Sequence, residues 1–300
     1  MSLILSREAW FVRAMPWLFV LIWSTGFIVA RYGMPYAPPM KFLAYRYLFS
    51  VLCLGAWVWL ARVAWPATKT QWCHMALTGV FMHAGYLGGV WTAVKAGIGA
   101  GLIALIVGLQ PVLTAWWLSS QGSQVSRRQW LGLILGLSGL VMVVGHKLEA
   151  STEVSLYTLG FGLLALMSIT LGTLYQKRWL QPCDVRSAGV IQLASAGLVT
   201  LPLALVESEP MAWDLMWGAM VWSVLVLTIG GSSLLYMLLQ RGAATQVTSL
   251  LFLVPPTTAV LAWVLFDEPL HALTLVGIAV TALGVSLVVQ QAHMREEKKL

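Results

Sequence analysis

Charged residues are scarce in this chain. Of its 300 residues, 10% are charged and 59% are hydrophobic, and the mean hydropathy is +0.81. A soluble domain carries charge on roughly a quarter of its residues, so this composition excludes a soluble globular protein. Continuous apolar runs such as residues 131–144 favour helices, because the strands of a membrane barrel alternate apolar and polar residues. The sequence therefore predicts an all-α integral membrane protein.

Acidic residues are fewer still. Eleven Asp and Glu residues stand against 18 Lys and Arg residues. All eleven are expected in tails, loops or helix ends, and none at the membrane midplane. Proton-driven pumps usually relay protons through a buried carboxylate. The sequence therefore favours a facilitator or exchanger, and coupling through a histidine is the alternative.

Residues at metal-binding or catalytic spacing are also missing. The three cysteines are far apart, and four of the histidines are scattered: Cys53, Cys73, Cys183, His74, His146, His271 and His293. We therefore expect no catalytic residue, no metal and no cofactor. A multispan enzyme acting on a lipid-linked substrate is the alternative from a different class, and a structural or sensory membrane protein is a further one.

What the chain does contain is a repeat. The pattern of residues 97–117 appears again 145 positions later. The pairs in register are Gly97 with Gly242, Pro111 with Pro256, Gly132 with Gly277 and Gly139 with Gly284. This agreement predicts two copies of one five-helix unit, residues 1–148 and 149–300, within a single membrane domain.

Ten transmembrane helices of about 20 residues fit the apolar segments. We expect them at about residues 15–32, 40–60, 73–94, 98–118, 129–146, 155–175, 187–206, 212–239, 243–265 and 271–290. Thirteen Lys and Arg residues then fall in segments on the side of the N-terminus and four in segments on the other side, which predicts cytoplasmic termini. Because five is an odd number, the second repeat is inverted relative to the first. Such inverted repeats are typical of secondary transporters that work by alternating access.

Four motifs resemble the drug/metabolite transporter superfamily in its EamA branch. They are Trp23-Ser24-Thr25-Gly26-Phe27, the spacing Pro39-x-x-Phe42-x-x-x-Arg46, the repeated hairpins with Pro111 and Pro256, and Asp267-Glu268-Pro269-Leu270. The resemblance implies ten helices, cytoplasmic termini, a bacterial-type inner membrane and export of amino acids or other small metabolites. The chain departs from the pattern at two places: the first copy has Gly122-Ser123 in place of the acidic turn, and the second has no arginine matching Arg46.

The first repeat offers three candidate substrate-binding residues. His83 lies near the centre of the third expected helix, where an ionisable group is costly and suggests function. Tyr86 shares its face, and Trp23 is expected to form a pocket wall. A neutral His83 hydrogen-bonded to a neighbouring helix is the alternative. Arg46 is expected to reach the lipid headgroups, although it could instead hold a substrate carboxylate.

The second repeat offers four more candidates. Ser232 and Tyr236 follow Thr228 at four-residue spacing, and Gln246 and Ser249 share a face of the ninth expected helix. Polar stripes of this kind line cavities or join helices. The two matching prolines, Pro111 and Pro256, are expected to kink their helices and to act as hinges.

Five glycines favour close helix approach, either within one chain or between two chains, so a monomer and a homodimer both remain open: Gly132, Gly136, Gly139, Gly277 and Gly284. Together these features predict a transporter of small metabolites, with amino acids, aromatic ones included, as the leading substrates. Its expected partners are this substrate and membrane lipid, with no nucleic acid. A proton-coupled exporter of lipophilic cations is the alternative within transport.

Overall fold

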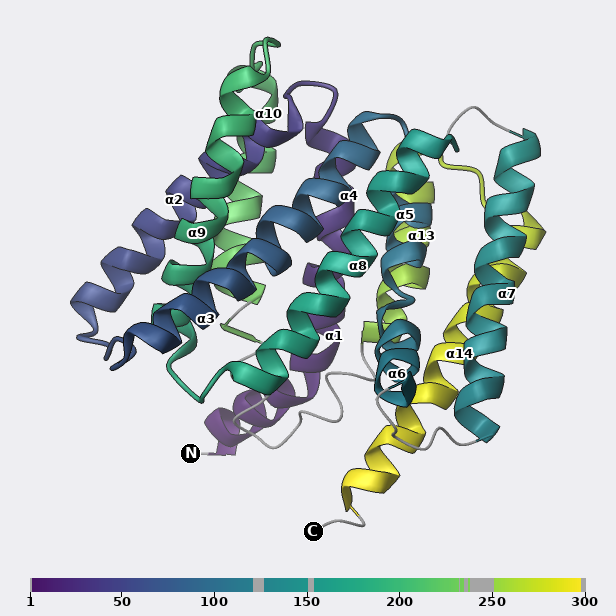
Figure 1. Ribbon diagram of the computed structural model, residues 1–300, viewed down its shortest axis with the longest axis horizontal. Helices are drawn as coiled ribbons and strands as arrows, with labels where there is room; N and C mark the ends of the chain where they lie inside the picture. Colours follow the sequence, from purple (N-terminus) through teal and green to yellow (C-terminus); the bar gives the residue numbers. More distant parts are fainter. Residues whose placement is uncertain are drawn as a thin grey trace.

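The computed structural model describes residues 2–120, 127–150, 154–231, 233–234, 237 and 251–297, and each element in these ranges is helical (Figure 1). The elements are α1 (Ser2–Gly33), α2 (Pro39–Leu60), α3 (Lys69–Gly79), the π-helix η1 (Val80–Gly85), α4 (Tyr86–Lys95), α5 (Ala100–Val107), α6 (Gln110–Ser120), α7 (Arg127–Ala150), α8 (Leu156–Trp179), α9 (Val185–Val206), α10 (Trp213–Val221), the π-helix η2 (Trp222–Gly231), the 3₁₀-helix η3 (Leu251–Leu253), α13 (Val254–Phe266) and α14 (Ala272–Glu297). The expected all-helical class is confirmed.

The described helices lie at each of the ten expected positions. Five stretches are long and apolar enough to cross a membrane: Ala14–Gly33, Pro39–Leu60, Leu156–Trp179, Val185–Val206 and Trp213–Gly231. Shorter apolar helices occupy Ala100–Thr114, Trp130–Gly145, Val254–Phe266 and Ala272–Leu287. Many large apolar side chains face outward, as at Leu156 and Val206, where lipid rather than water satisfies them.

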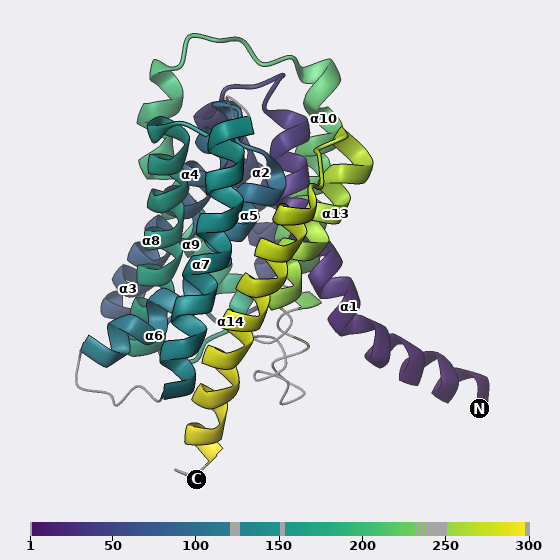
Figure 2. The same ribbon diagram turned by 90° about the vertical axis from the view of Figure 1, so that its right-hand side faces the viewer.

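The helices run side by side between two ends of one bundle (Figures 1 and 2). On one side α2 packs against α9, and on the other α7 packs against α14. Between these pairs, α1, α4, α5, α8 and α13 form the centre. The start of α1 and the end of α14 lie at the same end of the bundle, which we call the terminal end (Figure 2).

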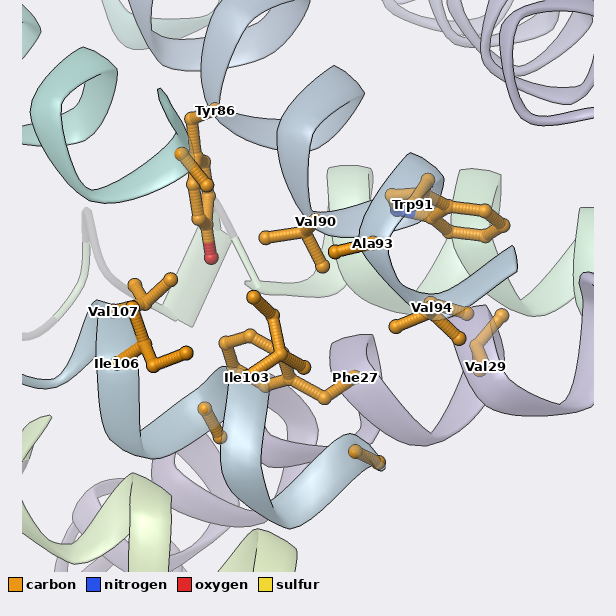
Figure 3. Packing of buried hydrophobic residues seen from close by; sticks show 14 of the residues in the cluster. Phe27, Val29, Tyr86, Val90, Trp91, Ala93, Val94, Ile103, Ile106 and Val107 are labelled. Carbon is orange, nitrogen blue, oxygen red and sulfur yellow. The ribbon is translucent and has the colours of Figure 1, made fainter. Parts of the chain in front are cut away.

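The centre of the bundle is apolar. Figure 3 shows side chains of α1, α4 and α5 meeting there, with Trp91 and Val94 near Val29, and Tyr86 near Val107. Trp91 is 1% exposed and stacks on Phe42, with 4.3 Å between ring centroids. Burial of such large side chains is the main stabilising contribution to this part of the bundle.

The contact between α7 and α14 depends on glycines. A Cβ atom on Gly284 would lie 2.6 Å from the Gly132 carbonyl oxygen, and one on Gly277 would lie 2.8 Å from the Gly139 carbonyl oxygen. The Thr281 hydroxyl lies in the same contact and donates to the Gly277 carbonyl at 2.9 Å. The close helix approach expected from these glycines therefore occurs within one chain.

Acidic side chains from the second half cap helices of the first half. The Glu268 carboxylate accepts hydrogen bonds from the Ala100 and Gly101 amides at 2.9 and 3.5 Å, and lies 3.7 Å from the Arg31 Nε. The Glu207 carboxylate likewise accepts from the first two amides inside α2, at 3.0 and 2.8 Å. Carboxylates are favoured there, because the first amides of a helix lack partners within it.

We expect Glu268→Gln to lower the stability of the protein by about 1 kcal/mol, because the charge that caps α5 is lost. Asp267→Asn is the matched control: Asp267 is exposed, and asparagine tolerates its positive φ of 54°. Thermal unfolding of the purified variants in detergent measures both changes. Equal melting temperatures for the two variants would contradict a capping role for Glu268.

Candidate functional site

A helix of the first half is interrupted at the place where, 145 positions later, an α-helix of the second half begins. The helix expected at residues 98–118 stops at Val107 and resumes as α6 at Gln110, since Pro111 has no N–H to continue the ladder. In the second half, η3 gives way to α13 after Leu253, which is 145 positions beyond Gly108. The interruption touches the first turn of α13, because a Cβ on Gly108 would lie 2.8 Å from the Pro255 ring.

A cavity of about 390 Å³ lies beside Gly108 and Pro255. Its walls come from α1, η1, α4, α5, α6, α8, η3 and α13: Phe19, Trp23, Phe27, Met82, Tyr86, Ala104, Val107, Gly108, Gln110, Pro111, Ile169, Thr173, Gln176, Lys177, Leu251, Val254 and Pro255. Small-molecule sites typically measure about 300–1,000 Å³ and combine apolar walls with a few polar groups. The cavity fits both criteria.

The polar groups of the cavity gather on α6 and α8. Gln110 Nε2 donates to the Thr173 hydroxyl at 2.8 Å, and the Thr173 hydroxyl donates to the Ile169 carbonyl at 2.7 Å. Further along α8, Gln176 and Lys177 are exposed. The opposite wall contains Tyr86, which Figure 3 shows extending from α4 toward α5. The cavity thus has an amide and a hydroxyl facing aromatic and aliphatic surfaces.

One end of the cavity is exposed and the other is buried. Gln176 and Lys177 lie near the last turn of α8, at the terminal end of the bundle (Figure 1). Phe27, Tyr86 and Ala104 are 4%, 8% and 1% exposed, and they line the deep part. A small molecule can therefore enter the cavity from the terminal end of the bundle. At the deep part of the cavity, the packed core of the bundle blocks its way.

The end of the bundle opposite the terminal end is held by polar contacts between the two halves. Besides the caps of Glu268 and Glu207, the Lys95 Nζ lies 2.7 Å from a Glu209 carboxylate oxygen. The Ala212 amide also donates to the Tyr36 carbonyl at 2.9 Å. These contacts close the bundle beyond the deep part of the cavity.

The cavity contains part of the site predicted from the sequence. Trp23, Tyr86 and Pro111 line it, and Pro256 lies in the first turn of α13 beside the lining Pro255. The predicted residues Ser232, Tyr236, Gln246 and Ser249 lie outside the described residues. They stay predictions.

His83 is absent from the described cavity lining and belongs to a polar cluster beside Tyr86. Its imidazole is hydrogen-bonded to the Gln192 side chain on α9, and its carbonyl accepts a hydrogen bond from the Tyr47 hydroxyl at 2.9 Å. Arg46 belongs to the same cluster and was expected to reach the lipid headgroups. That expectation is wrong, because Arg46 is only 8% exposed and its Nη2 points to the Thr228 hydroxyl at 3.5 Å.

Two π-helices border this polar cluster at matching positions of the repeat. Shifting η1 by 145 positions gives residues 225–230, which lie within η2. Within η2, the Thr228 hydroxyl donates to the Ser223 carbonyl, five residues earlier, at 2.9 Å. π-Helical turns are rare in proteins, and those that occur are often found at functional sites. The matching pair Gly85 and Gly230 was the available sequence signal for them.

The comparisons with known proteins agree with this architecture. The sequence profile of the EamA-like transporter family matches residues 14–145 and 156–290. The chain belongs to the EamA-like transporter family. The family and two of the chain's relatives are named as transporters, not as enzymes.

Individual relatives are distant. The chain is 26% identical over 190 residues to the uncharacterized inner membrane transporter YedA of Escherichia coli (strain K12), a match that covers 63% of the chain and 60% of the relative, less than two thirds of its length. It is 24% identical to a probable amino-acid metabolite efflux pump of Salmonella typhimurium, over 89% of the chain and 91% of the relative. A crystal structure of a protein with 18% identity superposes with a TM-score of 0.64, over 94% of this chain and 97% of that one, which shows the shared fold.

Proposed function

We propose that this EamA-like transporter carries small metabolites, amino acids foremost, through the cavity beside Gly108 and Pro255. The proposal rests on the cavity itself, which is exposed at the terminal end, buried at the other end, and bordered by the interruption before α6 and by the matching start of α13. The name of the Salmonella typhimurium relative, an amino-acid metabolite efflux pump, supports amino acids as substrates and export as the direction.

The mechanism we propose is alternating access by two inverted repeats, residues 1–148 and 149–300. The separate profile matches to residues 14–145 and 156–290 support two repeats, as do the π-helices at matching positions. The distribution of Lys and Arg supports cytoplasmic termini in a bacterial-type inner membrane, so the exposed end of the cavity faces the cytoplasm.

Opening to the other side requires the contacts of Glu207, Glu209 and Glu268 to separate while the terminal end closes. Pro111 and Pro256 are the proposed hinges, because each lies in the first turn of an α-helix at matching positions of the repeat and has no N–H for the backbone ladder. The predicted residues His83, Ser232, Tyr236, Gln246 and Ser249 would contribute to the substrate path during this change.

The cavity wall favours a zwitterion over a lipophilic cation. It offers aromatic and aliphatic surfaces, an amide and hydroxyl pair in Gln110 and Thr173, and the positive charge of Lys177 near its exposed end. A carboxylate that would attract a cation is missing from the described lining. The amide and hydroxyl match the donors and acceptors of an amino acid.

Counterflow of labelled amino acids in liposomes that contain the purified protein tests the proposal. We expect saturable exchange of one class among aromatic, aliphatic and charged amino acids without an imposed ion gradient, at a rate that a pH gradient leaves unchanged. Protein-free liposomes provide the control. Exchange that depends on the pH gradient would support the proton-coupled alternative instead, and consumption of the probe in detergent would indicate an enzyme.

A further inference from the structure

Arg46 is a buried cation whose charge has no described counter-ion. It lies in the second turn of α2 and is 8% exposed. In the described part of the chain, its side chain makes one hydrogen bond, the long contact of 3.5 Å from Nη2 to the Thr228 hydroxyl, and its Nε has no partner. The ion pairs described elsewhere use other cations: Arg31 with Glu268, Lys95 with Glu209 and Arg186 with Asp184.

An unpaired guanidinium in this position is costly. Arginine does not lose its proton in proteins, so it cannot escape the cost of burial by becoming neutral. Buried charges are therefore normally paired with an opposite charge. The Arg46 guanidinium therefore lacks a negatively charged partner. A carboxylate suits it, because the planar guanidinium can donate two parallel hydrogen bonds to the carboxylate oxygens.

Two further hydroxyls without partners lie on α2 and η2, the elements that contain Arg46 and Thr228. Ser50 lies one turn further along the same face of α2, and its hydroxyl is fully buried without a described partner. The Ser223 hydroxyl on η2 is likewise buried without a described partner. The Ser223 carbonyl accepts a hydrogen bond from the Thr228 hydroxyl. Several unsatisfied polar groups thus accompany one unsatisfied charge, which is unusual in a buried region unless a ligand completes it.

The cluster borders the cavity through Tyr86. This side chain lines the cavity, and it is close enough to Arg46 to interact with its charge. The cluster is also bounded by the two π-helices, through His83 of η1 and Thr228 of η2. Tyr86 thus belongs to both the cavity wall and the cluster around Arg46.

We infer that Arg46 binds the carboxylate of the transported metabolite, with the Thr228 hydroxyl orienting the guanidinium. This inference rests on the proposed transport through the cavity and names its substrate class: organic acids and amino acids whose carboxylate is free. The rest of such a substrate lies against Tyr86 and the apolar walls.

The test compares two probes that differ only at the carboxylate, L-phenylalanine and L-phenylalaninamide, in counterflow. We expect Arg46→Gln to slow L-phenylalanine exchange by about 30-fold or more, the loss typical of removing one member of a buried charge pair. Exchange of the amide should stay within about two-fold of the unmutated protein, because that probe has no group for Arg46 to hold. Arg128→Gln removes an exposed charge at the start of α7 and should affect neither probe.

Thermal unfolding in detergent separates recognition from a structural role. Without ligand, Arg46→Gln should melt at or above the temperature of the unmutated protein, because an unpaired buried charge is removed. An equal loss of both probes together with a lower melting temperature would overturn the inference in favour of a structural role. Unchanged exchange of L-phenylalanine would overturn it as well.

A binding measurement distinguishes failure of this inference from failure of the proposed function. If the unmutated protein exchanges neither probe, its melting temperature is measured with L-phenylalanine and with benzoate. A rise that Arg46→Gln abolishes supports carboxylate binding while the proposed amino-acid transport fails. If neither carboxylate raises the melting temperature, the inference fails too.

Discussion

Thr173→Trp should reduce substrate exchange to the level of protein-free liposomes. Thr173 lies on α8 within the cavity wall, and its hydroxyl accepts the hydrogen bond from Gln110 at 2.8 Å. An indole at this position projects into the 390 Å³ cavity and occupies the volume that a substrate needs. The cavity is open at the neighbouring Gln176 and Lys177, so the larger side chain has room and the fold should persist.

Leu164→Trp is the matched control for this substitution. Leu164 lies on the same helix, but its side chain is 47% exposed and faces away from the cavity lining. The control should exchange substrate like the unmutated protein. Gel filtration and thermal unfolding establish that both variants are folded, and a folded Thr173→Trp protein with normal exchange would place the substrate path elsewhere.

Gly284→Leu should prevent stable packing of α14 on α7. A side chain at Gly284 meets the backbone of Gly132 and Gly136, which cannot move aside as a flexible side chain could. Overpacking usually costs about 1–3 kcal/mol, and a backbone obstruction places this substitution at or above the upper end of that range. We expect a low yield of monodisperse protein and a markedly lower melting temperature.

The control for this second prediction is Gly145→Leu on α7. A Cβ on Gly145 meets nothing within 4 Å, and leucine favours a helix more than glycine does. This variant should melt at or above the temperature of the unmutated protein. If Gly284→Leu behaves in the same way, the α7 and α14 contact does not depend on the glycines.

The helices and their repeat could be predicted from local patterns. Apolar runs of membrane-spanning length indicate the helix positions, and Pro111 predicts the interruption seen before α6. The small residues around Gly139 and Gly284 predict a close contact, since only glycine lets two backbones approach so closely. What the sequence left open was whether that contact lies within one chain.

The environment of single polar residues could not be predicted in this way. Arg46 lies near a helix start in the sequence, which suggested contact with the headgroups, but its burial depends on η2, where Thr228 lies 182 positions away. The Gln110 and Thr173 bond joins helices 63 positions apart. Such pairs follow from how the helices cross, and neither periodicity nor composition contains that information.

The most direct test of alternating access through the cavity is the reaction of one cysteine from both sides of the membrane. Val107→Cys places a thiol in the deep part of the cavity, in a protein whose Cys53, Cys73 and Cys183 are replaced by serine. A membrane-impermeant maleimide is applied to either face of sealed vesicles. We predict labelling from both faces, faster from the face of the termini, and slower from each when a transported amino acid is present. Labelling from one face alone, unaffected by any transported amino acid, would contradict transport through this cavity.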